Sequence, residues 1–329
     1  MELIITRPDW TEAGYLECNS VDIENGGQND FEIMLSIRDY NADIHRNGSL
    51  IYVPGTEWGG IIKTIHPSGE TLYLGGPTWR GRLDKSIVVP DEGYDYYTVS
   101  GDANAVIGQV LARQGLTGLF RAPGVPTGIT FSSQVFPRYT SVLQGLNSIL
   151  AKKDARLKFR YIRGPANGIG YVEVSAACIR DLSNQIEINN DMQVNYDIEQ
   201  RYFTVNHLIC LGKGQLKDRL RVDLYVNQYG RIVDTMCFTG IDEVAEVYEL
   251  SNEETVENLK SQGERKLKEL LSSNTIKASF SSDRIEVDIG DIVSGRERIT
   301  GIRVRVPVVR KILIIKDGAE TIDYKLKGE

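Results

Sequence analysis

Residues 65–72 read Ile-His-Pro-Ser-Gly-Glu-Thr-Leu, and residues 315–322 read Ile-Lys-Asp-Gly-Ala-Glu-Thr-Ile. In both stretches an apolar residue ends one strand, turn-forming residues follow, and Glu-Thr with an aliphatic residue begins the next strand. This pattern is typical of a β-hairpin. A similar hairpin near each end of the chain predicts two similar β domains in one polypeptide. Duplicated domains let a ring contain twice as many modules as subunits, which is a structural role rather than a catalytic one.

Short strands fill the first hundred residues. Residues 31–37 alternate apolar and polar side chains, as a strand with one buried face does. More β-rich runs, cut by Pro and Gly turns, occur at residues 49–53, 60–65 and 71–74. This spacing is typical of a sandwich or small barrel, so we predict a first β domain over residues 1–98.

The pattern changes to α+β in residues 99–190. Asp102 is placed to cap a first helix, and Thr140 or Ser141 to cap a second helix whose apolar residues recur at helical spacing over 142–150. Strand patterns return after the second helix. We therefore expect an α+β insert between two β domains.

A second β domain follows, and a helix interrupts it. We predict a discontinuous β domain over residues 191–245 and 276–329, split by a helical insert over 246–275. A capping box at Ser251–Glu254 precedes a narrow apolar stripe made of Val256, Leu259, Gly263, Leu267, Leu270 and Leu271. Because a glycine weakens an isolated helix, we expect this helix to pack with the middle region or with a neighbouring subunit.

Composition sets limits on the class of protein. The 329 residues, 41% of them hydrophobic and 25% charged, suffice for two or three globular domains. A net charge of -7 argues against binding nucleic acid by wholesale phosphate neutralisation. We find no leader and no long apolar run, and expect a soluble, cytosolically made product without a membrane segment. The four cysteines lack Cys-x-x-Cys spacing and are expected to be buried, reduced thiols.

The motifs of common enzymes are missing from the sequence. It contains no Gly-x-Ser-x-Gly, no phosphate-loop string and no His-Glu-x-x-His. His45, His66 and His207 are widely dispersed, which favours structural roles over metal or acid–base roles. Residues 212–214, Gly-Lys-Gly, are better explained by a turn between strands than by a phosphate site. We therefore predict no enzyme activity and no catalytic, cofactor-binding or metal-binding residues.

Three further groups of residues have a functional and a structural interpretation. Acid–base work or calcium binding could use Asp288 with Asp291 or Glu253 with Glu254, although capping explains the two glutamates. Sugars or bases could stack on Trp58, Trp79, Tyr94, Tyr96 and Tyr97, although core packing or a subunit interface is favoured. A basic run, made of Arg296, Arg298, Arg303, Arg305, Arg310 and Lys311, is interpreted as the solvated face of a strand that pairs with acidic neighbours.

Several strings, taken in order, resemble a known family. They are Trp58-Gly59-Gly60-Ile61-Ile62-Lys63, Thr78-Trp79-Arg80-Gly81, Val99-Ser100-Gly101-Asp102-Ala103-Asn104, Val205-Asn206-His207-Leu208-Ile209-Cys210-Leu211-Gly212 and Asp288-Ile289-Gly290-Asp291-Ile292-Val293. With the closing Ile322-Asp323-Tyr324-Lys325, they look like tail hub proteins of siphophages and prophages of Gram-positive bacteria. These are also called tail-associated or baseplate hub proteins.

The resemblance implies a structural virion protein at the phage tail tip. It implies a homotrimer in which each subunit supplies two similar tube-like β-barrels, the first over residues 1–98 and the second, discontinuous, over 191–245 and 276–329. Together they would form a hub ring of pseudo-sixfold symmetry that continues the tail tube and passes DNA during ejection. The implied partners are the distal tail or tail-tube ring and other tail-tip, receptor-binding or tape-measure proteins. Many relatives carry C-terminal enzymatic or receptor-binding modules. This chain stops at Glu329, so we expect other tail proteins to supply adsorption or wall cleavage.

Two alternatives stay open at this point. A carbohydrate-binding or cell-wall-degrading tail protein is suggested by the aromatic residues and scattered carboxylates, and glycan binding or turnover would identify it. A β-rich enzyme of unknown type would have a deep pocket with converging polar groups.

Overall fold

A computed structural model describes residues 1–165, 169–185, 187–188, 196–199, 205–227, 231–271, 275–281, 286–296, 299–301, 303–316 and 318–326. For residues 187–188, 196–199, 275–281 and 303–304 it describes the backbone alone. The protein is mainly β, with several antiparallel sheets and a few helices, which confirms the predicted class.

The helices are α1 (Trp79–Asp84), α2 (Ala103–Arg113), α3 (Val142–Ala151) and α4 (Val256–Leu271). The strands of the first two thirds are β1 (Ile4–Thr6), β2 (Glu12–Tyr15), β3 (Ser20–Asn25), β4 (Asp30–Ser36), β5 (Leu50–Tyr52), β6 (Gly59–Ile61), β7 (Thr64–Ser68), β8 (Thr71–Pro77), β9 (Thr98–Asp102), β10 (Phe120–Arg121), β11 (Thr130–Val135), β12 (Ala155–Ile162), β13 (Tyr171–Cys178), β14 (Glu187–Ile188), β15 (Tyr196–Glu199) and β16 (His207–Leu211). They are followed by β17 (Arg221–Val226), β18 (Ile232–Val233), β19 (Ala245–Glu249), β20 (Thr275–Ser281), β21 (Ile292–Arg296), β22 (Arg303–Lys316) and β23 (Ala319–Leu326).

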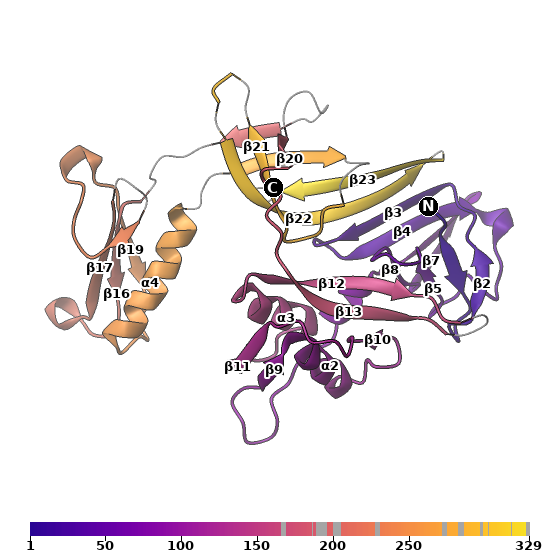
Figure 1. Ribbon diagram of the computed structural model, residues 1–329, viewed down its shortest axis with the longest axis horizontal. Helices are drawn as coiled ribbons and strands as arrows, with labels where there is room; N and C mark the ends of the chain where they lie inside the picture. The colour runs from indigo at the N-terminus through magenta and orange to yellow at the C-terminus, as the bar shows by residue number, and fades with distance from the viewer. Residues whose placement is uncertain are drawn as a thin grey trace.

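One ten-stranded sheet contains strands from both ends of the chain. Its order is β15-β20-β23-β22-β3-β4-β8-β7, and β21 also pairs with β22 and with β14. The two ends meet where β22 pairs with β3, in an antiparallel ladder from Lys311 opposite Asn25 to Lys316 opposite Ser20. Figure 1 shows the long, curved β22 and its neighbour β23 lying beside β3 and β4. The two β regions therefore form one continuous surface.

Both hairpins expected from the similar sequences are present, but their turns differ in position. β7 and β8 close with Ser68 opposite Thr71, whereas β22 and β23 close with Lys316 opposite Ala319. In the aligned sequences the second turn comes two residues earlier than the first. The similarity of the two sequences thus predicts two hairpins but not their registers. The duplication of whole barrels stays a prediction.

The N-terminal unit is a sheet packed on a sheet. A four-stranded sheet of order β2-β1-β5-β6 faces the β3, β4 and β8 part of the large sheet. Their shared core includes Ile5 from β1, Ile51 from β5, Ile23 from β3, Ile33 from β4 and Leu313 from β22. Since Leu313 comes from the C-terminal strands, the first β region has no complete core without the end of the chain.

The middle region is α+β, as predicted, and it docks on the N-terminal unit. Asp102 caps α2 by accepting from Asn104 N, and Ser141 caps α3 by accepting from Gln144 N. Both helices share a core with the sheet β10-β13-β12. Tyr52 of β5 and Tyr161 of β12 stack with their ring centroids 3.8 Å apart, which joins the middle region to the first unit.

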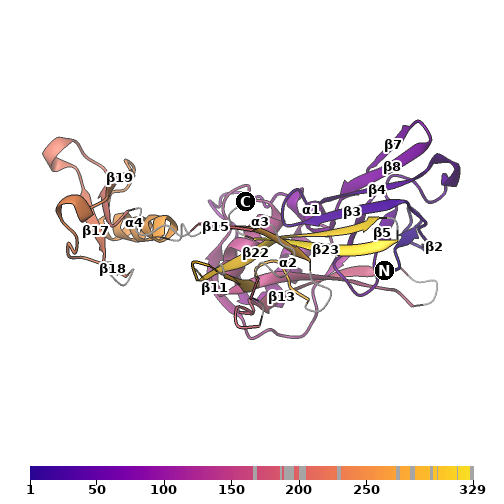
Figure 2. The ribbon, with the colours of Figure 1, turned by 90° about the horizontal axis from the view of Figure 1, so that it is seen from above.

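The helical insert forms a separate lobe with strands that we expected in the second barrel. β18-β17-β16-β19 make a four-stranded sheet, and α4 packs on β16 and β17. Both views place this lobe beside the main body (Figures 1 and 2). Leu208, Cys210, Leu224 and Val226 are buried in the core that this sheet shares with α4. A strand pattern indicates a buried face without identifying the element that covers it.

The N-terminus of α4 also differs from expectation. The helix begins at Val256, and Asn258 N donates to Thr255 Oγ1 at 3.4 Å, so Thr255 rather than Ser251 is its cap. The residues just before the helix contact the neighbouring sheet instead. Lys213 N donates to Glu253 O at 2.8 Å, which extends the turn between β16 and β17.

The exposure of the cysteines differs from expectation, and the described helices lack the features of membrane spans. The four thiols are free, but only Cys210 is buried, while Cys178 and Cys237 are exposed, so the expectation of four buried thiols was wrong. Each described helix is too short or too polar to cross a membrane.

The contact between α4 and its sheet yields a testable prediction. A Cβ on Gly263 would overlap Cys210 Sγ and approach Leu224 Cδ1 to 2.9 Å. Overpacking costs about 1–3 kcal/mol, more than the roughly 1 kcal/mol that alanine gains over glycine in a helix. We expect Gly263→Ala to lower the stability of the lobe, measured by hydrogen exchange of the α4 amides. In a Cys210→Ala background the same change should be neutral or stabilising, and equal effects in both backgrounds would contradict this packing.

Candidate functional site

The outer face of the large sheet carries a band of carboxylates. Asp22 and Glu24 alternate along β3, and Asp30 and Glu32 along β4, with their apolar neighbours directed to the core on the opposite face. Asp22 lies directly opposite Glu32 in the ladder. Asp323 of β23 lies on the same face, because both it and Glu24 pair with Ile312. We call these five residues the acidic face.

The acidic face is electrostatically unfavourable for folding. Partial desolvation within the sheet, together with the charges of Glu24, Asp30, Glu32 and Asp323, raises the pKa of Asp22. Desolvation and Glu24 also raise the pKa of Asp30. Among the described contacts, the four carboxylates of β3 and β4 take part in no ion pair. Like charges opposite each other destabilise a sheet. Glu24 also has a structural contact, because its Oε1 accepts from Gln28 N at 2.7 Å.

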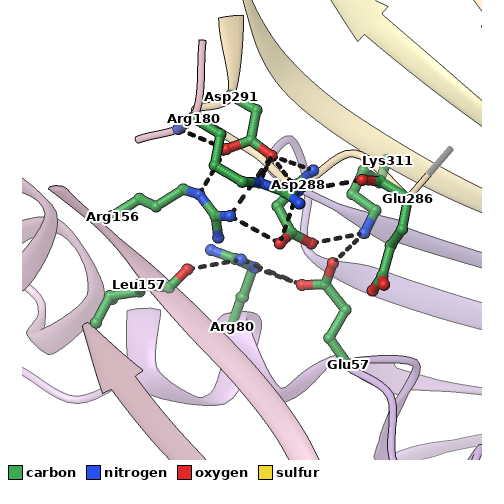
Figure 3. Close-up of polar contacts among 9 residues, drawn as sticks. All are labelled: Glu57, Arg80, Arg156, Leu157, Arg180, Glu286, Asp288, Asp291 and Lys311. Atoms are coloured by element: carbon green, nitrogen blue, oxygen red, sulfur yellow. Dashed lines mark hydrogen bonds and ion pairs between the residues drawn. The ribbon is translucent and has the colours of Figure 1, made fainter. Parts of the chain in front are cut away.

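A buried cluster of charges lies where the three parts of the main body meet. Glu57 and Arg80 come from the first unit, Arg156 and Arg180 from the middle region, and Asp288, Asp291 and Lys311 from the C-terminal region. Of these residues Arg180 is exposed, and the others are buried. Figure 3 shows these side chains converging from the three parts of the chain. We call this group the junction cluster.

Lys311 is the central cation of the junction cluster. Its Nζ lies 2.7 Å from Glu57 Oε1 and 3.2 Å from Asp288 Oδ1, and Glu57 Oε2 accepts from Arg80 Nη2 at 3.1 Å. The ammonium also faces the rings of Trp58 and Tyr324, 5.3 and 5.9 Å from their centroids. A single lysine of β22 thus holds carboxylates from two regions of the chain.

Arg156 and Arg180 complete the junction cluster from the other side. Arg156 Nη2 donates to Asp288 Oδ2 at 2.8 Å and its Nε to Asp291 Oδ1 at 3.0 Å. Arg180 Nε donates to Asp291 Oδ2 at 3.0 Å. The tight turn that presents both aspartates needs a glycine, since Gly290 has φ +99°. The carboxylate oxygens are therefore already bound to cations of the protein.

The cations of the junction cluster hold its carboxylates ionised. Burial alone would raise the pKa of Glu57 and of Asp288, but Lys311 with Arg80, and Lys311 with Arg156, outweigh it and lower both values. Burial would lower the pKa of Lys311, and Glu57 and Asp288 raise it instead. The cluster is thus a set of mutually neutralising charges rather than an acid–base pair.

The histidines occupy three unrelated places. His45 is buried and its Nδ1 accepts from Asn41 N at 3.1 Å, whereas His66 lies on β7 and stacks with Tyr73. His207 is buried in the lobe, with Nδ1 2.6 Å from Glu243 Oε1 and Nε2 2.8 Å from Asp223 Oδ1. Among the described residues, no group of three potential ligands could hold a metal ion.

The other predicted candidates are also spread over the molecule. Residues 212–214 form the turn between β16 and β17, as predicted. Trp58 and Trp79 are buried in the core, which removes them from any surface that could stack on a sugar, while Tyr94 and Tyr96 are exposed. Glu253 and Glu254 contact Gln262 and Lys213, far along the chain from the junction cluster.

The basic run was predicted correctly in part. Arg305 is exposed and pairs with Asp181, as the interpretation required, whereas Lys311 is almost fully buried. A bulge between Val308 and Arg310 shifts the register of β22, so that the inward side changes from even to odd residue numbers. Arg298 and the side chain of Arg303 lie outside the described residues.

Four members of the junction cluster were not predicted from the sequence: Glu57, Arg80, Arg156 and Arg180. One signal was available, because Arg156 stands between Ala155 and Leu157 in a strand whose neighbours are buried. A charge at such a position requires a buried partner. Its partners lie 132 and 135 residues away, beyond the reach of local patterns.

Comparison with known proteins identifies the fold. No family model matches the chain, and no curated protein matches its sequence. The 43 kDa tail protein of prophage MuSo2 from Shewanella oneidensis is similar in structure, with TM-score 0.61, 10% identity and coverage of 100% of this chain and 98% of that one. A tail protein from Neisseria meningitidis has TM-score 0.54, 13% identity and coverage of 100% and 96%. Prophage tail protein gp18 from Listeria monocytogenes has TM-score 0.53, 13% identity and coverage of 99% and 94%.

A chain of the phage P2 baseplate in its activated conformation is similar as well, with TM-score 0.50, 11% identity and coverage of 100% and 99%. The fold is therefore that of phage tail and baseplate proteins, along the whole chain. At these identities the similarity concerns the fold alone. It extends over tail proteins from several bacterial genera and singles out no type of host.

The first prediction from the site concerns Lys311. Replacing it by Met leaves Glu57 and Asp288 buried with fewer cations, and breaking a buried ion pair in this way costs roughly 3 kcal/mol. We expect Lys311→Met to lower the free energy of unfolding in urea by about that amount. Lys316→Met is the matched control on the same strand, because Lys316 is exposed. A loss of stability equal in the two variants would contradict the role of the cluster.

The second prediction concerns the acidic face and pH. Because the folded state raises the pKa of Asp22 above its ordinary 3.8, ionised Asp22 lowers stability at neutral pH. Asp22→Asn should raise the free energy of unfolding at pH 7 by roughly 0.5 kcal/mol. The gain should shrink as pH falls through the raised pKa and vanish below 3.8. Asp43→Asn, at an exposed position outside the sheet, is the control and should have no such pH dependence.

Proposed function

We propose that this chain is a structural protein of the phage tail tip and forms a homotrimeric hub ring of pseudo-sixfold symmetry that continues the tail tube and passes DNA. The fold, which is that of phage tail and baseplate proteins, supports the class of protein. The acidic face is the observation that carries the role in DNA passage.

The continuous sheet supports the ring. Two hairpins from opposite ends of the chain lie in one sheet, joined by β22 and β3, as two modules of one subunit would. At one end of the sheet order is β7, with all five of its residues exposed. Pro67 suits such an edge, because proline has no N–H to donate within a sheet. An open edge strand can pair with a second chain, so β7 is the proposed contact with the neighbouring subunit.

The acidic face supports DNA passage without retention. Each phosphate that a basic wall neutralised would strengthen binding and slow the exit of DNA. A wall of Asp22, Glu24, Asp30 and Glu32 would instead repel the phosphates. These carboxylates lower the stability of a sheet that would form part of the ring. Such a cost fits residues that line the lumen of a conduit. Arg305, which pairs with Asp181, fits a position away from that lumen.

The remaining features of the role follow from the same proposal. The chain would act without enzymatic activity in the virion, after synthesis in the host cytoplasm, and would contact the distal tail or tail-tube ring and other tail-tip, receptor-binding or tape-measure proteins. The domain plan of two tube-type barrels, the second discontinuous, belongs to this proposal. In it the lobe around α4 is an excursion from the second barrel.

Light scattering and electron microscopy of the purified full chain test the ring. We expect a mass three times the 36.8 kDa of one chain and a ring with six similar modules. Ile65→Lys, which places a charge on the open edge strand, should reduce the trimer, since charges block edge pairing. Val125→Lys, at a more exposed apolar residue in a loop, is the control. A protein that stays monomeric at every concentration, or that binds duplex DNA at physiological salt, would refute the conduit.

A further inference from the structure

A cavity of about 410 Å³ opens at the junction cluster. Its wall includes Arg80, Arg156 and Lys311 of the cluster, with Lys158 and Arg160 from the same strand as Arg156. The aromatic walls are Trp58, Phe159 and Tyr324. Glu57 and Asp288 of the cluster also line it. The cavity thus combines apolar surfaces with cations that outnumber the carboxylates, a composition suited to a small negatively charged molecule.

The buried charges of the junction cluster balance each other. Three buried cations, Arg80, Arg156 and Lys311, face three carboxylates, Glu57, Asp288 and Asp291, while the fourth cation, Arg180, is 44% exposed. Glu286 also lines the cavity, but it is exposed, and Figure 3 places its carboxylate on the far side of Lys311 from Arg156. The excess positive charge of the cavity wall is therefore that of the exposed Lys158 and Arg160.

Arg156 has a donor that the protein does not use. Its side chain is 8% exposed, and Nη1 has no hydrogen-bond partner among the residues that the structure describes. In Figure 3 the guanidinium groups of Arg156 and Arg80 lie next to each other, and the Arg156 nitrogen without a dashed line points toward Arg80. A buried N–H of a charged group without an acceptor is costly, and two adjacent guanidinium groups add repulsion. An acceptor with a negative charge would relieve both.

The strand β12 provides a path of positive charge to this donor. Arg156, Lys158 and Arg160 lie on one face of the strand, because side chains alternate along it. The first is buried and the other two are exposed. Arg160 already pairs with Glu173 at 2.9 Å, which leaves Lys158 as the exposed cation nearest along the strand to Arg156.

We propose that the junction cavity binds one small oxyanion, a carboxylate or phosphate group, which accepts from Arg156 Nη1 and is attracted by Lys158. The bound anion would give this buried donor an acceptor where the three parts of the main body meet. It would therefore stabilise their docking. This site is separate from the acidic face, and its existence does not depend on the proposed ring.

Calorimetric titration of the purified full chain with inorganic phosphate, and separately with acetate, tests the site at constant ionic strength in chloride. We expect saturable binding of one anion per chain and a rise in melting temperature that saturates with it. Arg156→Lys keeps the charge and removes the unused donor, so the affinity should fall roughly tenfold or more. Phosphate binding without acetate binding would assign the site to phosphates, and the reverse to carboxylates.

A second variant covers the case in which Arg156→Lys fails to fold. Lys158→Glu changes an exposed side chain at the cavity and should weaken binding, whereas Lys153→Glu makes the same charge change at an exposed residue outside the cavity and should not. The proposal is overturned if neither anion binds saturably to the unmodified chain. It is also overturned if Lys158→Glu and Lys153→Glu bind with equal affinity, because binding would then lie elsewhere.

Discussion

The pairing of β22 with β3 is the contact on which the rest of the structure depends. It joins strands separated by almost the whole chain into one sheet, and it places Leu313 in the core of the N-terminal unit. The same ladder positions Lys311, whose ammonium then reaches Glu57. The continuity of the acidic face from β4 to β23 also requires it. A single antiparallel contact thus sets the main sheet, the junction cluster and the charged outer surface.

The junction cluster uses charge where most cores use apolar packing. Replacing buried ion pairs by hydrophobic residues is often neutral or stabilising, so their presence argues for specificity of docking rather than for strength. Apolar surfaces can slide past each other with little change in energy, whereas Lys311 on Glu57 and Arg156 on Asp288 together accept one arrangement of the three regions. We interpret the cluster as the element that selects how the regions meet.

Local features were predictable from sequence, and long-range ones were not. The caps at Asp102 and Ser141, the two hairpins and the turn at residues 212–214 depend on neighbouring residues, which the sequence displays directly. The inward turn of Lys311 depends on a bulge, and a bulge follows from pairing rather than from composition. The packing of α4 on β16 and β17 was missed for a related reason, because an amphipathic stripe does not state its partner. The carboxylates of β3 and β4 were visible as an alternating pattern, but their common face required the strand register.

The late position of β22 in the chain has a consequence for folding on the ribosome. β3 emerges early, and the strand that covers its free edge emerges only after some 280 further residues. Contacts between such distant segments form slowly, and unpaired strand edges promote association between incomplete chains. During synthesis the N-terminal unit therefore carries an open edge at β3 that the finished molecule does not have. A chain truncated before β22 would expose that edge permanently, and aggregation rather than a smaller soluble domain would be its fate.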